Sequence, residues 1–241
     1  KNSLFKNNDG EFILNLSADS RFDFKNNTYE NSGYYRGVNF YGPATRDATW
    51  RDLGVPYVIR GGIDIGPLAT IQIEPGTIFK FDQNSRLAIN GVLIAEGTAA
   101  EPIIFTSFKD DVFGDTNSNS TATLPQKNDW GEIIFENATG LSKLSFAEIR
   151  YGGEFHGDFT GIMYATNHYD SVYIKNSQVE IKNSKIETGG TRGIFQEKGG
   201  TFSLENSEVS GHTVGVLVSA QTSALPVIKN NKIFNNSWLG L

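Results

Sequence analysis

The sequence predicts an all-β solenoid, a protein in which short parallel strands stack coil upon coil. Three observations predict it. Apolar residues recur with a period of about 23 residues, which is typical of solenoids with one or two short strands per repeat. The 26 glycines and the many Asn, Ser and Thr residues are typical of strands joined by tight turns. No segment has the apolar period of a good amphipathic helix.

The repeat is clearest near the C-terminal end of the chain. Each unit there is a short apolar β run, an Asn-containing corner and a further apolar residue, and such units stand at 179–186, 202–209 and 227–233. A similar unit at 22–29 lies near the N-terminal end. Repeats at both ends favour a single domain over residues 1–241 rather than two small domains.

The middle of the chain carries strands of the same kind in quick succession. We expect strands at 57–59, 63–65, 70–73, 78–81, 87–89, 92–94, 103–105, 130–135 and 144–149. Gly, Pro and Asn residues separate most of them. Asn90-Gly91 fits either a hairpin or a corner, and the surrounding periodicity favours the corner.

Strands this short bury little surface alone, so each coil needs its neighbours. Stacking places equivalent residues above one another at about 4.8 Å, and the inward positions then form ladders of Ile, Val, Leu and Phe. The aromatic residues expected in these ladders are Phe22, Phe24, Phe79, Phe81, Phe105, Phe135, Phe146 and Phe202. At the corners, we expect side-chain amides to bond to their equivalents in the next coil, through Asn26, Asn183, Asn206 and Asn230.

Two polar stretches interrupt the repeat. Residues 107–129 are rich in Asp, Asn, Ser and Thr, and residues 154–170 contain two histidines, several acids and two tyrosines. We expect both to be long loops that leave the stack of coils.

Several stretches resemble a known family. The C-terminal units VEIKNSKI, FSLENSEV and PVIKNNKIFNN look like the right-handed parallel β-helix of the pectin-lyase-like superfamily. Upstream, repeats of bacterial secreted and cell-surface β-helix proteins are similar to ATIQIEPGTIFKF, LAINGVLIAEGTAAEPIIFTS, NDWGEIIF and LSFAEIRYGG. The resemblance covers most of the chain and implies a right-handed parallel β-helix. It implies no single activity, because this superfamily holds lyases, hydrolases, adhesins and structural stalks.

Composition restricts the partners. A net charge of −6 argues against nucleic acid and against an anionic membrane surface, both of which need a basic face. No apolar run approaches the ~20 residues of a membrane helix, so we expect no membrane insertion. The chain has no cysteine and therefore no disulfide or thiol chemistry. No signal peptide is recognisable, but the chain starts at Lys1, so one could have been removed.

The first polar stretch contains candidate ligands for a metal ion. Oxygen-bearing side chains at alternating positions are the ligands that Ca²⁺ takes. They are Asp110, Asp111, Asp115, Asn117 and Asn119. The stretch 115–119 has the D-x-N-x-N spacing of half a calcium loop, but Ser120 replaces the usual glycine and no closing glutamate follows. We expect Ca²⁺ in a structural role here, and the alternative is a solvated polar loop.

The second polar stretch offers the residues for a catalytic alternative. An acid/base pair or a metal site could be drawn from Arg150, His156, Asp158, His168 and Asp170. The resemblance implies what such a site would need: Ca²⁺ and a Lys or Arg base in β-helix lyases, or suitably spaced carboxylates in β-helix glycosidases. Neither arrangement is present as a recognisable motif, so we expect a polar loop without catalysis.

Aromatic residues supply a third candidate site. Exposed rings stack on sugars while polar neighbours bind the hydroxyl groups. We expect this role for Tyr151, Tyr164, Tyr169, Trp50 and Trp130, and further rings outside the inward alternation are Tyr34, Tyr35, Tyr41 and Trp238. The alternative is that these rings cover the coils and anchor the loops.

The sequence therefore predicts a non-catalytic module that binds a polysaccharide, such as a plant or bacterial glycan, or another surface. We expect it to be secreted or on the surface of a bacterial cell, of the adhesin or carbohydrate-binding type, and to form part of a longer surface protein. One alternative is a β-helix polysaccharide lyase or glycoside hydrolase. The other is a structural stalk segment without a ligand.

Overall fold

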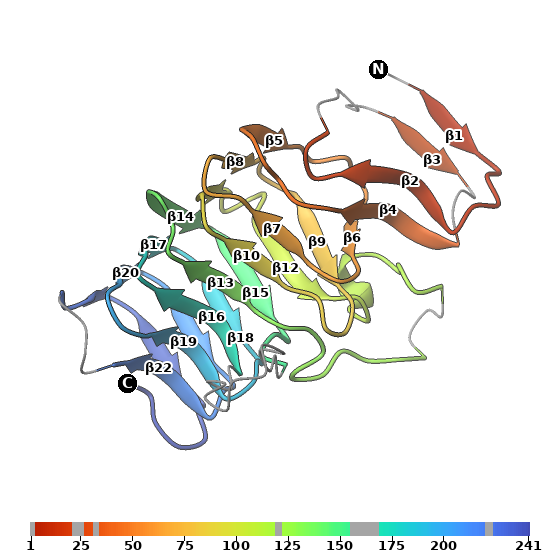
Figure 1. Ribbon diagram of the computed structural model, residues 1–241. Helices are drawn as coiled ribbons and strands as arrows, with labels where there is room; N and C mark the ends of the chain where they lie inside the picture. The colour runs from red at the N-terminus through yellow and green to blue at the C-terminus, as the bar shows by residue number, and fades with distance from the viewer. Residues whose placement is uncertain (1–2, 21–26, 31–33, 119–121, 155–168, 220–223) are drawn as a thin grey trace, which may run out of the picture.

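The chain is a stack of parallel coils. The computed structural model describes residues 3–20, 27–30, 34–118, 122–154, 169–219 and 224–241. Within them, every strand pair is parallel, and three long sheets run through the molecule (Figure 1). A strand of one sheet is followed along the chain by a strand of the next, so three successive strands make one coil. The predicted all-β parallel β-helix is thus confirmed.

We number the sheets in the order in which a coil visits them. Sheet 1 contains β7 (Ile63–Ile65), β10 (Leu87–Ile89), β13 (Ile133–Glu136), β16 (Asp170–Lys175), β19 (Arg192–Gln196) and β22 (Val214–Val218). Sheet 2 contains β5 (Ala48–Trp50), β8 (Thr70–Ile73), β11 (Val92–Glu96), β14 (Leu141–Ser145), β17 (Gln178–Lys182), β20 (Thr201–Glu205) and β23 (Val227–Lys229). Sheet 3 contains β2 (Phe12–Ser17), β4 (Tyr35–Tyr41), β6 (Tyr57–Ile59), β9 (Ile78–Phe81), β12 (Ile103–Ser107), β15 (Ala147–Arg150), β18 (Lys185–Glu187), β21 (Glu208–Ser210) and β24 (Lys232–Phe234). Strands β1 (Leu4–Lys6) and β3 (Thr28–Glu30) form a separate pair near the N-terminus.

The core is a set of inward ladders, as the alternation predicts. In sheet 3, the register aligns Tyr57 with Phe79 and Phe79 with Phe105, and all three are buried. Their rings stack with centroids 5.2 Å and 5.4 Å apart. Each ring buries apolar surface worth roughly 1.5–3 kcal/mol, which no strand of three to five residues could bury without its neighbours. The prediction is wrong for Phe146, which is a half-buried corner residue with a φ of 48°.

The corners between sheets 2 and 3 depend on backbone conformation rather than on amide ladders. Asn183, Asn206 and Asn230 have φ values of 51°, 51° and 56°, in the left-handed region that Asn tolerates better than most residues. Their side chains are exposed. The bonds between coils come from the next residue, because the backbone N–H of Ser184 donates to Oγ of Ser207 at 3.1 Å.

An Asn amide ladder of the expected kind occurs at a different corner. Between sheets 1 and 2, Nδ2 of Asn176 donates to Oδ1 of Asn137 at 2.9 Å. Asn176 and Asn137 also have positive φ values of 46° and 53°. The predicted interaction therefore exists, but the residues that make it differ from those expected.

The two interruptions behave differently. After β12 the chain crosses the outer face of sheet 3, where the rings of Phe108 and Tyr35 meet at 5.4 Å and a short 3-10 helix spans Asp111–Phe113. The second interruption lies largely outside the described residues, and Asp170 at its end is the first residue of β16.

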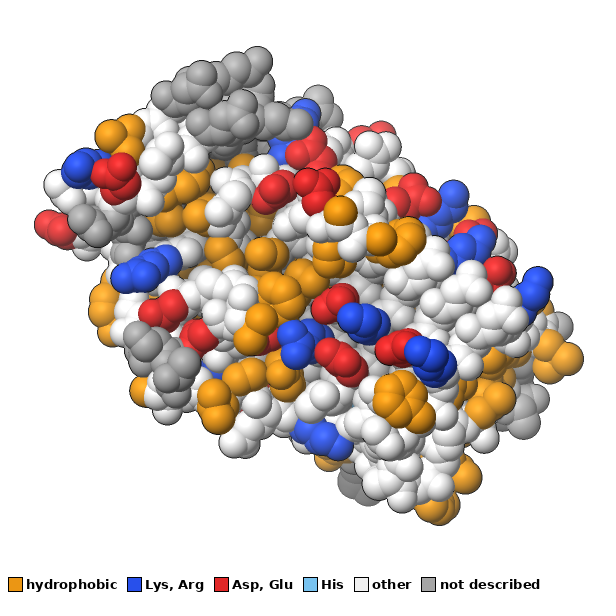
Figure 2. Space-filling model, turned by 180° about the vertical axis from the view of Figure 1, so that it is seen from behind, with side chains coloured by type: hydrophobic (Ala, Val, Ile, Leu, Met, Phe, Trp, Pro, Cys, Tyr) orange, Lys and Arg blue, Asp and Glu red, His pale blue; other side chains and the backbone are white. Residues whose placement is uncertain are grey.

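Ion pairs join successive coils on the outside of the stack. On sheet 3, Lys185 lies 2.9 Å from Glu148 and Lys232 lies 2.7 Å from Glu208. Figure 2 shows acidic and basic side chains alternating across the surface opposite the view of Figure 1. Because opposite charges meet only in one alignment, such pairs favour the observed register over a shifted one.

Candidate functional site

The first coils of sheet 3 present a row of polar side chains to solvent. Strand alternation turns Leu14 and Leu16 toward the core side and leaves Asn15 on the outer face. The register aligns Asn15 with Asn39 and Ser17 with Tyr41, so equivalent outward residues stand side by side. Arg60, which directly follows β6, extends the row by one more coil.

These side chains line a groove of about 400 Å³, which we call the sheet 3 groove. Its lining residues are Gly10, Glu11, Phe12, Asn15, Asn39, Tyr41 and Arg60. Nδ2 of Asn39 donates to Oδ1 of Asn15 at 2.8 Å, which fixes the two amides against each other. The ring of Tyr41 is 48% exposed. The groove therefore combines an accessible aromatic ring with a fixed pair of amides.

Arg60 is held at the edge of the groove by two carboxylates. Its Nη1 donates to Oε1 of Glu11 at 2.6 Å, and its Nε lies 3.4 Å from Oδ2 of Asp82. Its guanidinium also lies over the ring of Tyr35, 5.7 Å from the centroid. The hydrogen bond to Glu11 is the main cause of the raised pKa of Arg60, so the group stays charged.

The groove has the chemistry of a sugar-binding surface. Amide, phenol, carboxylate and guanidinium groups supply both donors and acceptors for hydroxyl groups, while an exposed ring offers an apolar face. The groove thus offers both polar and apolar contacts to a hydroxylated ligand.

A comparison with models of known protein families finds a match to part of this chain. Residues 133–241 match the family model described as a right handed beta helix region. The chain is a right-handed parallel β-helix. Its strands before residue 133 continue the same three sheets, so the helix extends well beyond the matched part. Neither the curated proteins nor the solved structures contain a significant match.

The predicted tryptophan contacts to a ligand are wrong. Trp130 is fully buried in the β-helix, with its ring stacked 4.2 Å from that of Phe81 and its Nε1 donating to the carbonyl of Arg150. Trp50 is also buried, and its Nε1 donates to the carbonyl of Ala18 at 3.1 Å. Neither ring offers a face to a sugar. Tyr34 and Tyr41 are the exposed tyrosines among the described residues, and of these two Tyr41 lines the sheet 3 groove. The sequence marks both only as rings outside the inward alternation.

The predicted tyrosine contacts have different outcomes. Tyr151 is half-buried, has a φ of 64° and packs under the guanidinium of Arg150, 5.3 Å from its ring centroid. Tyr169 is half-buried, and its carbonyl accepts the backbone N–H groups of Thr191 and Arg192. Tyr164 lies outside the described residues. A ligand-binding role for Tyr151 and Tyr169 stays a prediction.

The predicted calcium ligands lie around a lysine. Asp110 is buried, Asp111 and Asp115 are partly buried, and all three act electrostatically on the ammonium of Lys80. That ammonium is fully buried, bonds to Oγ1 of Thr116 at 3.0 Å and also bonds to the carbonyl of Gly114. A positively charged group of the protein itself, the Lys80 ammonium, therefore lies among these acids.

Electrostatics of this cluster show how tightly it is enclosed. Burial lowers the pKa of Lys80 to about 8, although the three aspartates oppose the change. Burial, and then the charge of Asp115, raises the pKa of Asp111. The described residues contain no group of three or more His, Cys, Asp or Glu side chains arranged to hold a metal ion. Asn117 is partly buried and Asn119 lies outside the described part. Calcium stays a prediction for this segment.

The residues of the catalytic alternative do not come together among the described ones. Arg150 pairs with Glu187 at 3.1 Å and lies 3.6 Å from Asp110, so its charge is used in holding coils and loop together. Asp170 is fully buried, and its carboxylate accepts hydrogen bonds from both Nε and Nη2 of Arg192. His156, Asp158 and His168 lie outside the described residues.

Two buried polar sites, both in or beside strands of sheet 1, are not indicated by any sequence pattern. Glu132 is fully buried, both of its carboxylate oxygens lack a hydrogen-bond partner, and burial and then Asp170 raise its pKa far above the usual range. Ser171 and His212 are also buried, with Oγ and Nε2 3.1 Å apart. Glu132 follows Trp130-Gly131 directly, but only the packing of neighbouring coils shows that its side chain is enclosed.

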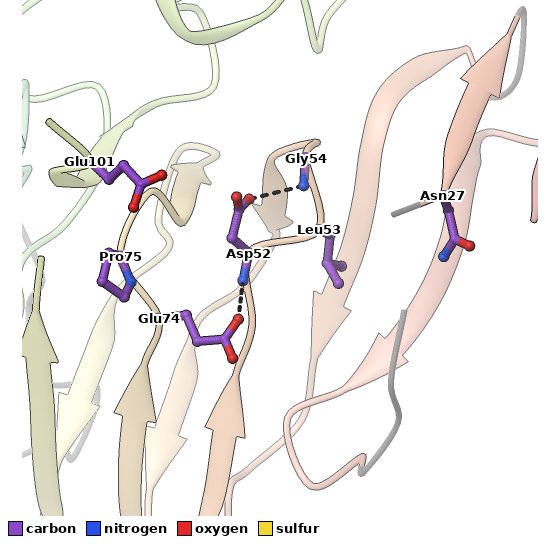
Figure 3. A pocket seen from close by; sticks show the side chains of 7 residues that line it. All are labelled: Asn27, Asp52, Leu53, Gly54, Glu74, Pro75 and Glu101. Carbon is purple, nitrogen blue, oxygen red and sulfur yellow. Dashed lines mark hydrogen bonds between the residues drawn. The ribbon is translucent and has the colours of Figure 1, made fainter. Parts of the chain in front are cut away.

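A second pocket of the β-helix is acidic. Asp52, Glu74 and Glu101 come from three successive coils and line a cavity of about 540 Å³ at the corner between sheets 2 and 3 (Figure 3). The carboxylate of Asp52 accepts the backbone N–H of Gly54 at 2.9 Å, and that of Glu74 lies 2.6 Å from Arg51. Its described lining residues include no aromatic ring, so it lacks the sugar-stacking element that the sheet 3 groove has.

Proposed function

We propose that the chain is a non-catalytic module that binds polysaccharide through the sheet 3 groove. The observation that carries the proposal is the exposed ring of Tyr41 beside the fixed amide pair of Asn15 and Asn39. The groove lies on rigid strands, so its polar groups are held in place before a ligand arrives, which reduces the entropy lost on binding.

The proposed setting is the outside of a bacterial cell, as part of a secreted or surface protein of the pectin-lyase-like superfamily. A glycan of plant or bacterial origin is the proposed partner, and nucleic acid is not, because the net charge is −6. The described part of the chain has no helix whose length and apolar character would let it cross a bilayer.

A hydrolase or lyase is the second candidate, and one observation favours it. Burial, and then the charge of Asp170, strongly raise the pKa of Glu132, and Asp170 itself accepts hydrogen bonds from Arg192. A carboxyl group whose pKa is raised by burial and by a nearby acid is a candidate general acid for a hydrolase. Both side chains have no exposed surface, however, so neither reaches a polymer in this conformation.

A glycan array combined with isothermal titration tests the proposal. Wild-type protein is expected to bind at least one soluble polysaccharide without releasing new reducing ends or unsaturated products. Tyr41→Ala and Asn39→Ala should each weaken that binding by about fivefold to thirtyfold, since each removes a contact worth roughly 1–2 kcal/mol. Trp238→Ala is the matched control, because Trp238 is 74% exposed and lies at the other end of the chain.

Two results would contradict the proposal. Turnover of any polymer that Glu132→Gln abolishes would favour the hydrolase. Binding that is unaffected by Tyr41→Ala and Asn39→Ala would remove the groove as the site.

A further inference from the structure

We infer that the sheet 3 groove selects uncharged sugar units over uronate-type, carboxylate-bearing ones. The inference rests on the proposed function and names the class of polysaccharide. It is drawn from the charges at the groove and from the bonds that those charges already make.

The groove has no uncompensated positive charge. Arg60 is the one cation among its described lining residues, and it pairs with Glu11 at 2.6 Å and Asp82 at 3.4 Å. Two carboxylates against one guanidinium leave a net charge of about −1 at this edge of the groove. A sugar carboxylate entering there meets like charges rather than a free cation.

Opening the ion pair between Arg60 and Glu11 does not favour the binding of an anionic sugar. Arg60 and Glu11 are about half exposed, so their ion pair is weak and can open. When it opens, however, Glu11 and Asp82 remain attached to the adjoining strands, and their charges remain near the groove. Repulsion of an incoming carboxylate therefore persists whichever partner Arg60 takes.

Hydroxyl groups fit the same surroundings well. A carboxylate is a strong acceptor for a sugar O–H, so Glu11 becomes a binding group for an uncharged sugar rather than an obstacle. The amides of Asn15 and Asn39 both donate and accept, and their mutual bond uses only Oδ1 of one and Nδ2 of the other. Tyr41 adds an exposed ring face for the apolar side of a pyranose.

The charge argument predicts a change of preference in a designed variant. Glu11→Gln with Asp82→Asn keeps the shape of the groove and leaves the guanidinium of Arg60 without its carboxylate partners. This double variant should gain affinity for a polyuronate at least tenfold, and the gain should fall with added salt. Its affinity for an uncharged glycan should fall by about threefold to tenfold rather than rise, because the amide that replaces the Glu11 carboxylate still accepts hydroxyl hydrogen bonds but without the charge.

A second double variant controls for net charge. Glu96→Gln with Glu101→Gln removes the same number of negative charges from side chains that are exposed and outside the sheet 3 groove. This control should show no gain for the polyuronate. The difference between the two double variants isolates the local effect of Arg60 from the overall charge of the protein.

The experiment is a titration of the wild type and both double variants with polygalacturonate and with a panel of uncharged glucans, galactans and mannans at low ionic strength. We expect the wild type to bind at least one uncharged polymer ten times more tightly than polygalacturonate. Equal or tighter binding of polygalacturonate by the wild type would overturn the inference and leave the proposed function standing. Failure of Glu11→Gln/Asp82→Asn to gain polyuronate affinity would also overturn it. Binding of no polymer at all would overturn the proposed function itself, and the inference with it.

Discussion

The ammonium of Lys80 lies 3.0 Å from Oγ1 of Thr116, so a lysine on the outer face of sheet 3 is bonded to the loop that crosses it. Thr116 in turn donates to the carbonyl of Phe108. Both Lys80 and Thr116 are fully buried. The contact encloses a charge between sheet and loop, which explains why a long polar excursion packs against the coils at this point.

Replacing Lys80 should release this loop. Lys80→Met removes the positive charge that lowers the pKa of Asp111 and leaves the buried carboxylate oxygens of Asp110 and Asp111 without that counter-charge. We expect the free energy of unfolding to fall by about 1.5–3 kcal/mol, because the variant loses the hydrogen bonds that the charged ammonium makes to Thr116 and to the carbonyl of Gly114. Urea denaturation measures this change. Lys143→Met is the control, because Lys143 is partly exposed and lies 4.0 Å from Glu96; a Lys80 variant as stable as that control would contradict the account.

The calcium prediction can be tested in the same protein. If the segment binds a structural Ca²⁺ as predicted, EDTA should lower the melting temperature by more than about 2 °C. If the ammonium of Lys80 is instead the cation among Asp110, Asp111 and Asp115, EDTA should leave the melting temperature unchanged. Differential scanning calorimetry with EDTA, and then with excess Ca²⁺, gives the answer. A fall with EDTA that Ca²⁺ reverses would show that the segment binds the metal in addition to Lys80.

His212 should make the stability of the protein depend on pH. Burial, followed by the charge of Lys127, lowers its pKa to about 4 from 6.5, while Asn236 and the backbone of Ser210 oppose the shift. The unfolded chain therefore takes up this proton at higher pH than the folded one. This difference in pKa contributes about 3 kcal/mol to the free energy of unfolding. The contribution is fully present above pH 6.5 and is lost as the pH falls toward 4.

Urea denaturation of the wild type and of His212→Gln between pH 7 and pH 4 measures this contribution. The variant should lose less stability than the wild type across that interval, because glutamine does not titrate. Parallel curves for the two proteins would show that His212 is protonated as easily in the folded chain as in the unfolded one.

The serine ladder between sheets 2 and 3 should carry a measurable share of stability. Oγ of Ser207 accepts the N–H of Ser184 at 3.1 Å and donates to the carbonyl of Glu205 at 2.8 Å. Ser207→Ala leaves the buried N–H of Ser184 without that acceptor, at a cost of about 1–3 kcal/mol. Ser203→Ala, at a half-buried position of β20, should cost less than about 0.5 kcal/mol. Thermal denaturation measures both losses. Equal losses for Ser207→Ala and Ser203→Ala would contradict a special contribution of the serine ladder.

The sequence was sufficient for the coils because their pattern is local. Alternation places Phe79 and Phe105 inward, and a short strand that must bury one face has few alternatives to stacking. The left-handed corners at Asn183 and Asn206 follow from the same logic, since few other side chains accept that conformation. Which side chain then bonds to the next coil depends on its direction of exit from the corner, and the expectation failed at that step.

The candidate site could not be predicted because it depends on contacts between coils. Asn15 and Asn39 are distant in sequence, and only the register of β2 with β4 brings their amides together. Alternation shows that Lys80 faces outward, but not that a loop will bury it. Trp130 stands next to a polar stretch in the sequence, yet it turns inward onto Phe81.

The central claim is that a glycan occupies the sheet 3 groove, and hydrogen exchange measured by mass spectrometry tests it most directly. With the tightest-binding uncharged glycan at saturation, backbone amides in residues 10–17 and 35–41 should exchange more slowly, while those of 227–234 should not change. Protection confined to residues 52–54 and 74–75, or no protection with any glycan tested, would contradict the claim.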